Sequence, residues 1–253
     1  MTAKLRIAHC SDIHLDGDVH SYGAAGMNWS GNGGGEFHRR AFATALEEIA
    51  AHAPDMMLLP GDLFDTNRAR ADTIQWAMEI LGRQPFPIIM IPGNHDCMEE
   101  GAIYRRHDFN RVDNVTMLCA EAGEMAHLPE LGVAVWGKGM VEHTPRYSPL
   151  AGCPDRPADC RWYLGMGHGL FVPHRGETGR SSQIHMREIE ASPCDYLALG
   201  HHHAAMELMS AQSAAAYSGS PTDTVGRGPT YVMVELTEGA PAALEVHPVR
   251  NFG

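Results

Sequence analysis

The order of elements expected in the N-terminal third of the chain restricts the fold more than any other feature. Three short apolar segments, 4–10, 55–60 and 87–91, have the length and residue types of β-strands. The segments 36–53 and 70–82 repeat apolar residues at spacings of three and four, which is typical of amphipathic helices, and Pro54 ends the first. Strands that alternate with helices pair in parallel through right-handed crossovers. The sequence therefore predicts an α/β fold built on a parallel sheet.

The rest of the chain has shorter strand signals, separated by a proline-rich segment at 145–157. We expect one helix near 182–190 and strands at 115–118, 131–136, 163–167, 195–199, 214–217, 231–236 and 243–247. Because the pattern changes, we expect a second sheet. A chain of 253 residues with 44% hydrophobic content can bury one full core, so residues 1–253 are expected to form a single domain. The glycine-rich segment 16–35 is expected to be a loop, and its role is left open.

Five short polar motifs each follow an expected strand. They are Asp12-Ile13-His14, Gly61-Asp62-Leu63-Phe64-Asp65, Gly93-Asn94-His95-Asp96, Gly167-His168-Gly169 and Gly200-His201-His202-His203. Ligands bind at the carboxyl ends of strands in α/β sheets, so the motifs should converge on one crevice. The 16 histidines of the chain gather in such motifs, which indicates metal ligation. The glycines allow the backbone to approach a metal or a phosphate closely.

In this order the motifs resemble those of the calcineurin-like metallophosphoesterases. Each motif alone is weak evidence, but the ordered set of five is specific, and the resemblance extends from about residue 5 to residue 221. It implies an α/β metallophosphoesterase fold, a two-sheet β-sandwich flanked by helices. It also implies a hydrolase that cleaves phosphoesters with two divalent metal ions.

The resemblance implies a role for each residue of the motifs. One metal would be held by Asp12, His14 and His203, and the other by Asn94, His168 and His201. Asp62 would bridge the two ions, which agrees with the need of two closely spaced cations for a shared carboxylate. His95 would contact the phosphate and protonate the leaving group, with Asp96 as its orienting partner.

Some assignments stay open on the residues alone. An isolated His14 or His168 would more often be a buried core histidine than a ligand. His202 is expected to point away from its neighbours, toward a supporting or surface role. Asp65 fits either a helix cap or a partner of a metal ligand. Imidazole and oxygen ligands suit manganese, which we expect first, and also iron or zinc.

Further phrases resemble the SbcD-type DNA repair exonucleases within this superfamily. They are His9-Cys10-Ser11-Asp12-Ile13-His14-Leu15, Gly61-Asp62-Leu63-Phe64-Asp65-Thr66, Asp195-Tyr196-Leu197-Ala198-Leu199-Gly200-His201 and Tyr217-Ser218-Gly219-Ser220-Pro221. This likeness implies a phosphodiesterase, with a nuclease or exonuclease as the leading interpretation. Such nucleases carry a DNA-capping domain and an ATPase-docking segment, for which the roughly fifty residues after His203 leave no room. A phosphodiesterase of cyclic nucleotides or other small diesters is the alternative, and a non-catalytic scaffold is a third.

The composition of the chain limits the kinds of partner that we expect. The formal net charge of −12 contrasts with the basic face of most proteins that bind duplex nucleic acid. No apolar segment approaches the roughly 18 residues of a membrane span, and the N-terminus runs directly into a strand, so we expect a cytoplasmic chain without a membrane partner. Six scattered cysteines without a C-x-x-C pair agree with a reducing compartment. The expected partner is a phosphodiester substrate, a nucleic acid end or a nucleotide-like diester, and the sequence identifies no protein partner.

Overall fold

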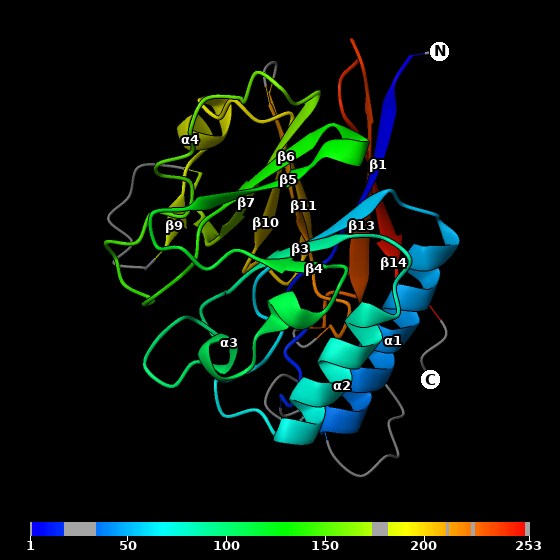
Figure 1. Ribbon diagram of the computed structural model, residues 1–253, viewed down its shortest axis with the longest axis vertical. Coiled ribbons are helices and arrows are strands. Elements are labelled where there is room, and N and C mark those ends of the chain that lie inside the picture. Colours follow the sequence, from blue (N-terminus) through cyan, green and yellow to red (C-terminus); the bar gives the residue numbers. More distant parts are fainter. Residues whose placement is uncertain (1, 18–33, 174–181, 211–212, 224–225, 251–253) are drawn as a thin grey trace.

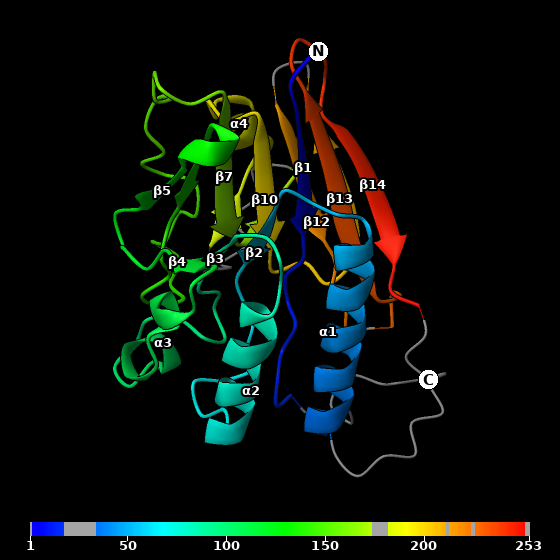
Figure 2. The same ribbon diagram turned by 45° about the vertical axis from the view of Figure 1, so that its right-hand side comes forward.

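Two six-stranded sheets face each other at the centre of the protein. The structure is a computed structural model that describes residues 2–17, 34–173, 182–210, 213–223 and 226–250. Figure 1 and Figure 2 show helices α1 (Gly34–Ala51) and α2 (Ala71–Gly82) side by side, with α4 (Met186–Glu190) on the opposite side of the molecule. The predicted two-sheet α/β sandwich with flanking helices is confirmed. Residues 18–33 of the glycine-rich loop lie outside the described residues.

The first sheet has the order β14-β13-β1-β2-β3-β4. Its parallel part is formed by β1 (Lys4–His9), β2 (Met56–Pro60), β3 (Ile88–Ile91) and β4 (Val115–Met117). The sheet continues beyond β1 with β13 (Thr230–Thr237), which is antiparallel to β1, and then with β14 (Ala243–Pro248), which is antiparallel to β13. Thus β4, grouped above with the strands of the second half, belongs to the first sheet, because Val115 pairs with Ile88.

The second sheet has the order β11-β12-β10-β7-β6-β5. Its four central strands are parallel: β6 (Val133–Gly137), β7 (Trp162–His168), β10 (Tyr196–Gly200) and β12 (Ala214–Ser218). The edge strands β5 (Glu124–Leu128) and β11 (Ala205–Met209) are antiparallel and were not predicted. Both carry charged residues and are only partly buried, so their sequences lack the apolar signal of the central strands.

The apolar strands of the first sheet are buried on both faces. In β2, Met56 and Leu58 belong to the core between the sheets, whereas Met57 and Leu59 pack with the helix layer. This alternation follows from the two-residue repeat of a strand. It explains why β2 consists of apolar residues throughout.

Short elements complete the described chain. They are α3 (Ile103–Arg106), the paired strands β8 (Leu170–Phe171) and β9 (Gln183–Ile184), and the 3₁₀ helices Phe109–Arg111 and Pro129–Leu131. Within the described ranges, no helix combines the length and the apolar character needed to cross a bilayer. The carboxyl ends of β1, β2, β3, β7 and β10 each lead into one of the five polar motifs.

Candidate metal centre

The backbone of the polar loops is strained at four of the predicted ligands. Asp12, His14, Asp62 and His201 have φ angles of 57°, 51°, 54° and 100°. Non-glycine residues in this region cost about 1–3 kcal/mol each and persist only where the surroundings fix them. Here the N–H groups of Ile13 and His14 both donate to the carbonyl oxygen of Asp62, at 2.8 and 3.1 Å. Strain gathered in one cluster of loops points to a functional site.

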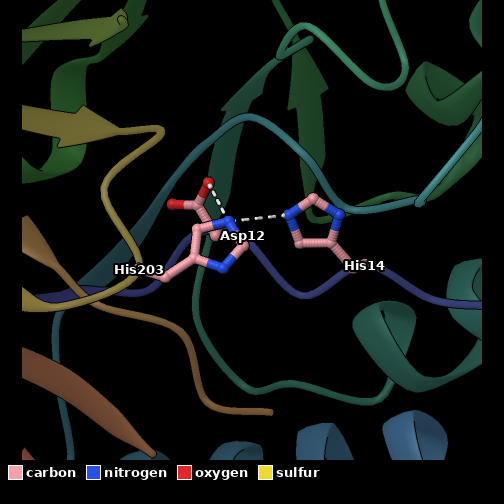
Figure 3. Close-up of side chains that lie close together, drawn as sticks. All are labelled: Asp12, His14 and His203. Atoms are coloured by element: carbon pink, nitrogen blue, oxygen red, sulfur yellow. Dashed lines mark hydrogen bonds and ion pairs between the residues drawn. The ribbon is translucent and has the colours of Figure 1, made fainter. Parts of the chain in front are cut away.

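A first cluster of donor atoms comes from the loops after β1 and β10. One ligand atom from each of Asp12, His14 and His203 lies within 4.8 Å of the others. The Nε2 atoms of His14 and His203 face each other at 3.1 Å, and His203 Nε2 lies 3.8 Å from Asp12 Oδ1 (Figure 3). Two imidazole nitrogens and a carboxylate oxygen that converge in this way form a geometry suited to a divalent metal ion.

A second cluster lies beside the first. Donor atoms of Asp62, His168 and His201 also lie within 4.8 Å of one another. The Oδ1 atom of Asn94 is 3.0 Å from His168 Nε2 and 2.8 Å from His201 Nδ1, so its side chain joins this cluster. The His201 N–H donates to the Asp12 carboxylate at 3.0 Å, which links the two clusters through the backbone.

The Asp62 carboxylate lies between the clusters. Its Oδ2 atom is 3.2 Å from His168 Nε2 and 3.7 Å from His14 Nε2, and its Oδ1 atom accepts the His95 N–H at 2.9 Å. Burial acts to raise the pKa of Asp62, but His168 and His14 hold that pKa far below its usual range. Asp62 is therefore an anion that faces both clusters, as a bridging ligand must.

His168 is buried and oriented by the backbone. Its Nδ1 donates to the carbonyl oxygen of Pro60 at 2.8 Å, which leaves Nε2 to face Asp62 and Asn94. Burial acts to lower the pKa of His168, yet the Asp62 carboxylate raises this pKa to about 9. Without metal the ring is therefore protonated on both nitrogens at neutral pH. A metal ion bound at Nε2 would displace the proton on that atom.

Two glycines allow the loops to approach this closely. A Cβ atom at Gly93 would lie 2.1 Å from Asp62 Oδ1. Gly61 has a φ of +94°, and a Cβ atom there would lie 2.4 Å from His168 Nδ1. Side chains at these positions would push the ligands apart.

His95 stands at the edge of the first cluster. Its ring centroid is 4.6 Å from that of His14, and its side chain is partly exposed. Its Nδ1 donates to the Asp65 carbonyl oxygen at 2.8 Å, so Nε2 is the nitrogen available to a substrate. The Asp65 carboxylate contacts His14 Nδ1 at 3.0 Å and lies 3.7 Å from His95 Nδ1.

These contacts differ from the expected pairing of His95 with Asp96. Asp96 is buried, and its oxygens accept hydrogen bonds from the Gly93 N–H, the Phe64 N–H and the Tyr104 hydroxyl, at 2.7, 3.2 and 2.6 Å. Burial and the Asp62 charge raise the pKa of Asp96. Asp96 thus fixes the turn that carries Asn94 and His95, and the hydrogen bond of the His95 ring is made with the carbonyl oxygen of Asp65 instead.

The structure shows the contacts of Asp65 and His202, whose roles the sequence left open. Asp65 does not cap α2, whose N-cap is Arg70, and its carboxylate contacts the predicted ligand His14 instead. The Nδ1 atom of His202 lies 2.8 Å from the Ala204 carbonyl oxygen, and its ring packs near Tyr217. His202 is thus absent from both donor clusters. The sequence reasoning missed His143, whose ring centroid lies 6.0 Å from that of His201.

The donor set fits divalent metal ions. Two nearby groups of histidine nitrogens and carboxylate or amide oxygens, without a cysteine sulfur, suit cations such as manganese, iron or zinc. All nine residues predicted for the site lie at the strand ends and on the loops that form this centre. The fold and the donor clusters thus form a site that can hold two divalent metal ions.

The family model of the calcineurin-like phosphoesterases matches residues 5–205. The chain therefore belongs to the calcineurin-like phosphoesterase family, whose members bind two divalent metal ions. The family membership predicted from the ordered motifs is confirmed.

Two curated relatives match shorter stretches. The SbcD component of the nuclease SbcCD from Staphylococcus saprophyticus is 31% identical over 105 residues, which cover 32% of this chain and 28% of that protein. The glycerophosphodiester phosphodiesterase GpdQ from Enterobacter lignolyticus is 31% identical over 93 residues, 36% of this chain and 29% of that protein. The matches thus span less than a third of the length of either relative.

Solved structures support the fold. The purple acid phosphatase PPD1 from yellow lupin seeds aligns with 98% of this chain and 52% of its own, with a TM-score of 0.57 and 12% sequence identity. Another solved structure aligns with 98% of this chain and 100% of its own, with a TM-score of 0.63 and 11% identity. At these identities the likeness concerns the fold alone.

Proposed function

We propose that this protein is a dinuclear metal-dependent phosphodiesterase. The observation that carries the proposal is the position of Asp62 between two donor clusters, with the His95 ring at their edge. Asp12, His14 and His203 would hold one ion, and Asn94, His168 and His201 the other. Two divalent ions held there would polarise a phosphate and stabilise its developing charge. We propose manganese as the native metal, with iron or zinc as alternatives.

His95 supplies the proton that the leaving group needs. Its Nδ1 is engaged with the Asp65 carbonyl oxygen, so the opposite nitrogen, Nε2, is directed at the substrate. An alkoxide leaving group has a high pKa and must be protonated as the bond breaks, and a positioned general acid contributes about 10²–10⁴-fold. Asp96 supports this step indirectly, because it fixes the turn that presents His95.

The charge of the centre supports a diester substrate. Two divalent cations, the carboxylates of Asp12 and Asp62 and one hydroxide sum to about one positive charge, which complements the single charge of a diester. The two curated relatives are named as a nuclease subunit and a phosphodiesterase. We infer a phosphodiesterase of the SbcD-like branch that acts on nucleic acid ends or on nucleotide-like diesters.

Hydrolysis of small diesters is the second candidate. The net charge of −12 favours it, because an acidic surface repels a long polyanion but affects a small monoanion much less.

A side-by-side assay tests the proposal. Metal-loaded protein is given a chromogenic diester, a chromogenic monoester and end-labelled DNA. Faster turnover of the diester than of the monoester supports the proposal, and degradation of DNA selects the nuclease over the small-diester enzyme. Preference for the monoester rejects the proposal.

A further inference from the structure

A hollow lies among the loops that follow β4 and β6. It has a volume of about 460 Å³, and its walls include Glu121, Lys138, Glu142, Thr144, Arg146 and Tyr147. This volume is in the range of sites for small organic molecules.

The topology places the hollow next to the Asn94–His168–His201 cluster. Asn94 and His168 follow β3 and β7. In the first sheet the next strand beyond β3 is β4, and in the second sheet the next strand beyond β7 is β6. Glu121 lies in the loop after β4, and Lys138 directly follows β6. The hollow thus lies at the carboxyl ends of β4 and β6, and these strands are the neighbours of β3 and β7, whose carboxyl ends carry Asn94 and His168.

His143 connects the hollow with the centre. Its ring lies 6.0 Å from His201, between centroids, while its neighbours in sequence, Glu142 and Thr144, line the hollow. His95 lies at the other cluster, 4.6 Å from His14. His95 is thus close to His14, and His143 is close to His201, and neither of the two is a predicted metal ligand.

The walls of the hollow are held in place. The Met98 N–H donates to the Met140 carbonyl oxygen at 2.7 Å, and the Gly139 N–H donates to that of Ala120 at 2.9 Å. These bonds fix the loop after β6 to the loops after β3 and β4. The Tyr147 hydroxyl donates to the Lys138 carbonyl oxygen at 3.0 Å, which closes the loop on itself. A site formed in advance of binding loses less entropy when a ligand enters.

The lining defines the chemistry of the occupant. The positive charges of Lys138 and Arg146 balance the negative charges of Glu121 and Glu142. The hollow therefore has no net formal charge and does not favour a second phosphate. Within the described part of the chain, the side chains of Glu142, Thr144 and Arg146 have no hydrogen bond or ion pair to protein groups, and they offer both acceptors and donors. Val141 and the ring of Tyr147 add apolar surface, so an uncharged organic group that carries hydroxyls fits this lining better than a polyanion.

We propose that the hollow binds the organic group on the non-leaving side of the phosphodiester, a hydroxyl-bearing group such as a nucleoside or a glycerol. The inference rests on the proposed function, because it assumes that the leaving group lies beside His95. The second ester group then extends past His143 into the hollow. This subsite makes the enzyme selective for diesters with a polar group in that position.

The test varies only the non-leaving group. Thymidine nitrophenyl phosphate, glycerol nitrophenyl phosphate and methyl nitrophenyl phosphate release the same nitrophenolate, so differences in kcat/KM report on the second ester group. We expect the wild-type protein to prefer the thymidine or the glycerol ester over the methyl ester by about tenfold, and which of the two is preferred identifies the group. Arg146→Ala should reduce this preference at least about fivefold, mainly through KM, which is the effect of one hydrogen-bond donor.

Two further variants make the result specific. Glu142→Gln keeps the shape of the side chain and should also reduce the preference. Arg83→Ala removes an arginine that is exposed at the end of α2 and pairs with Glu79, and it should leave the preference unchanged. A wild-type protein that hydrolyses the three esters equally well overturns the subsite while the proposed function stands.

Failure of the proposed function gives a different result. If the metal-loaded protein hydrolyses none of the esters, the proposed function is rejected, and the subsite is judged by saturation-transfer NMR with thymidine and with glycerol. Signals that weaken in Arg146→Ala support the subsite, and the absence of any signal overturns it.

Discussion

The Nδ1 atom of His14 lies 3.0 Å from the carboxylate of Asp65. The carbonyl oxygen of the same Asp65 accepts a hydrogen bond from His95 Nδ1 at 2.8 Å. Asp65, in the loop after β2, therefore orients a proposed metal ligand through its side chain and the proposed proton donor through its backbone. The two contacts are separable by mutation, because a substitution removes the carboxylate and keeps the carbonyl.

Asp65→Ala should weaken metal binding while the His95 contact persists. Loss of a carboxylate that orients a histidine ligand typically reduces metal affinity about 10–100-fold. Isothermal titration with manganese measures this change. Asp72→Ala is the matched control, since Asp72 is exposed on α2 and pairs with Arg39 and Arg70 away from the centre. Equal affinities in the two variants would show that the Asp65 carboxylate does not support the site.

Asp62→Asn should keep the fold and lose the paired metals. The substitution preserves size but removes the buried negative charge that faces His14 and His168. We expect at most one ion per chain by metal analysis of the purified variant, with an unchanged circular dichroism spectrum. Two tightly bound ions together with normal activity would show that Asp62 is not the bridge.

His95→Asn should separate substrates by their leaving group. A natural nucleotide diester releases a basic alkoxide and depends on a donated proton, whereas a nitrophenolate needs much less help. We expect kcat on the natural diester to fall by about 10²–10⁴-fold and activity on the nitrophenyl ester to fall far less, with both metals retained. Equal losses would indicate that His95 stabilises the phosphoryl oxygens instead, and no loss would exclude a catalytic role.

Binding of duplex DNA by the isolated chain should be weak. With 19 lysines and arginines against 31 acidic residues, the chain can release few phosphate counterions. We expect a Kd above about 1 μM at physiological salt in a fluorescence anisotropy titration, in line with non-specific binding. A submicromolar Kd would contradict this expectation and favour a duplex-processing nuclease.

The sequence predicted the central strands of both sheets but missed β5 and β11, the two edge strands of the second sheet. The apolar segments at 55–60 and 87–91 correspond to β2 and β3, because strands buried on two faces have an unbroken apolar signal. The edge strand β5 has the partly exposed sequence EMAHL, in which no period stands out. Sheet membership was also harder than strand position, since the pairing of β13 with β1 joins segments from opposite ends of the chain.

In the site, the sequence predicted which residues gather but not every contact between them. The position of each motif directly after a strand was enough to predict that Asp12, Asp62 and His168 lie in the same region of the fold. The partner of His95 was assigned to the adjacent Asp96, yet the ring contacts Asp65 from another loop. The signal was present in the motif G-D-x-x-D, whose second carboxylate follows Asp62 by three residues. His143 carries no motif, and only the folded loop after β6 brings it near His201.

The most direct test of the dinuclear centre is an anomalous-scattering map of crystals grown from manganese-loaded protein. We predict two peaks roughly 3.5–4 Å apart, both in contact with the Asp62 carboxylate. One peak should have the ligands Asp12, His14 and His203, and the other Asn94, His168 and His201. A single peak, or two peaks that do not share Asp62, would contradict the account.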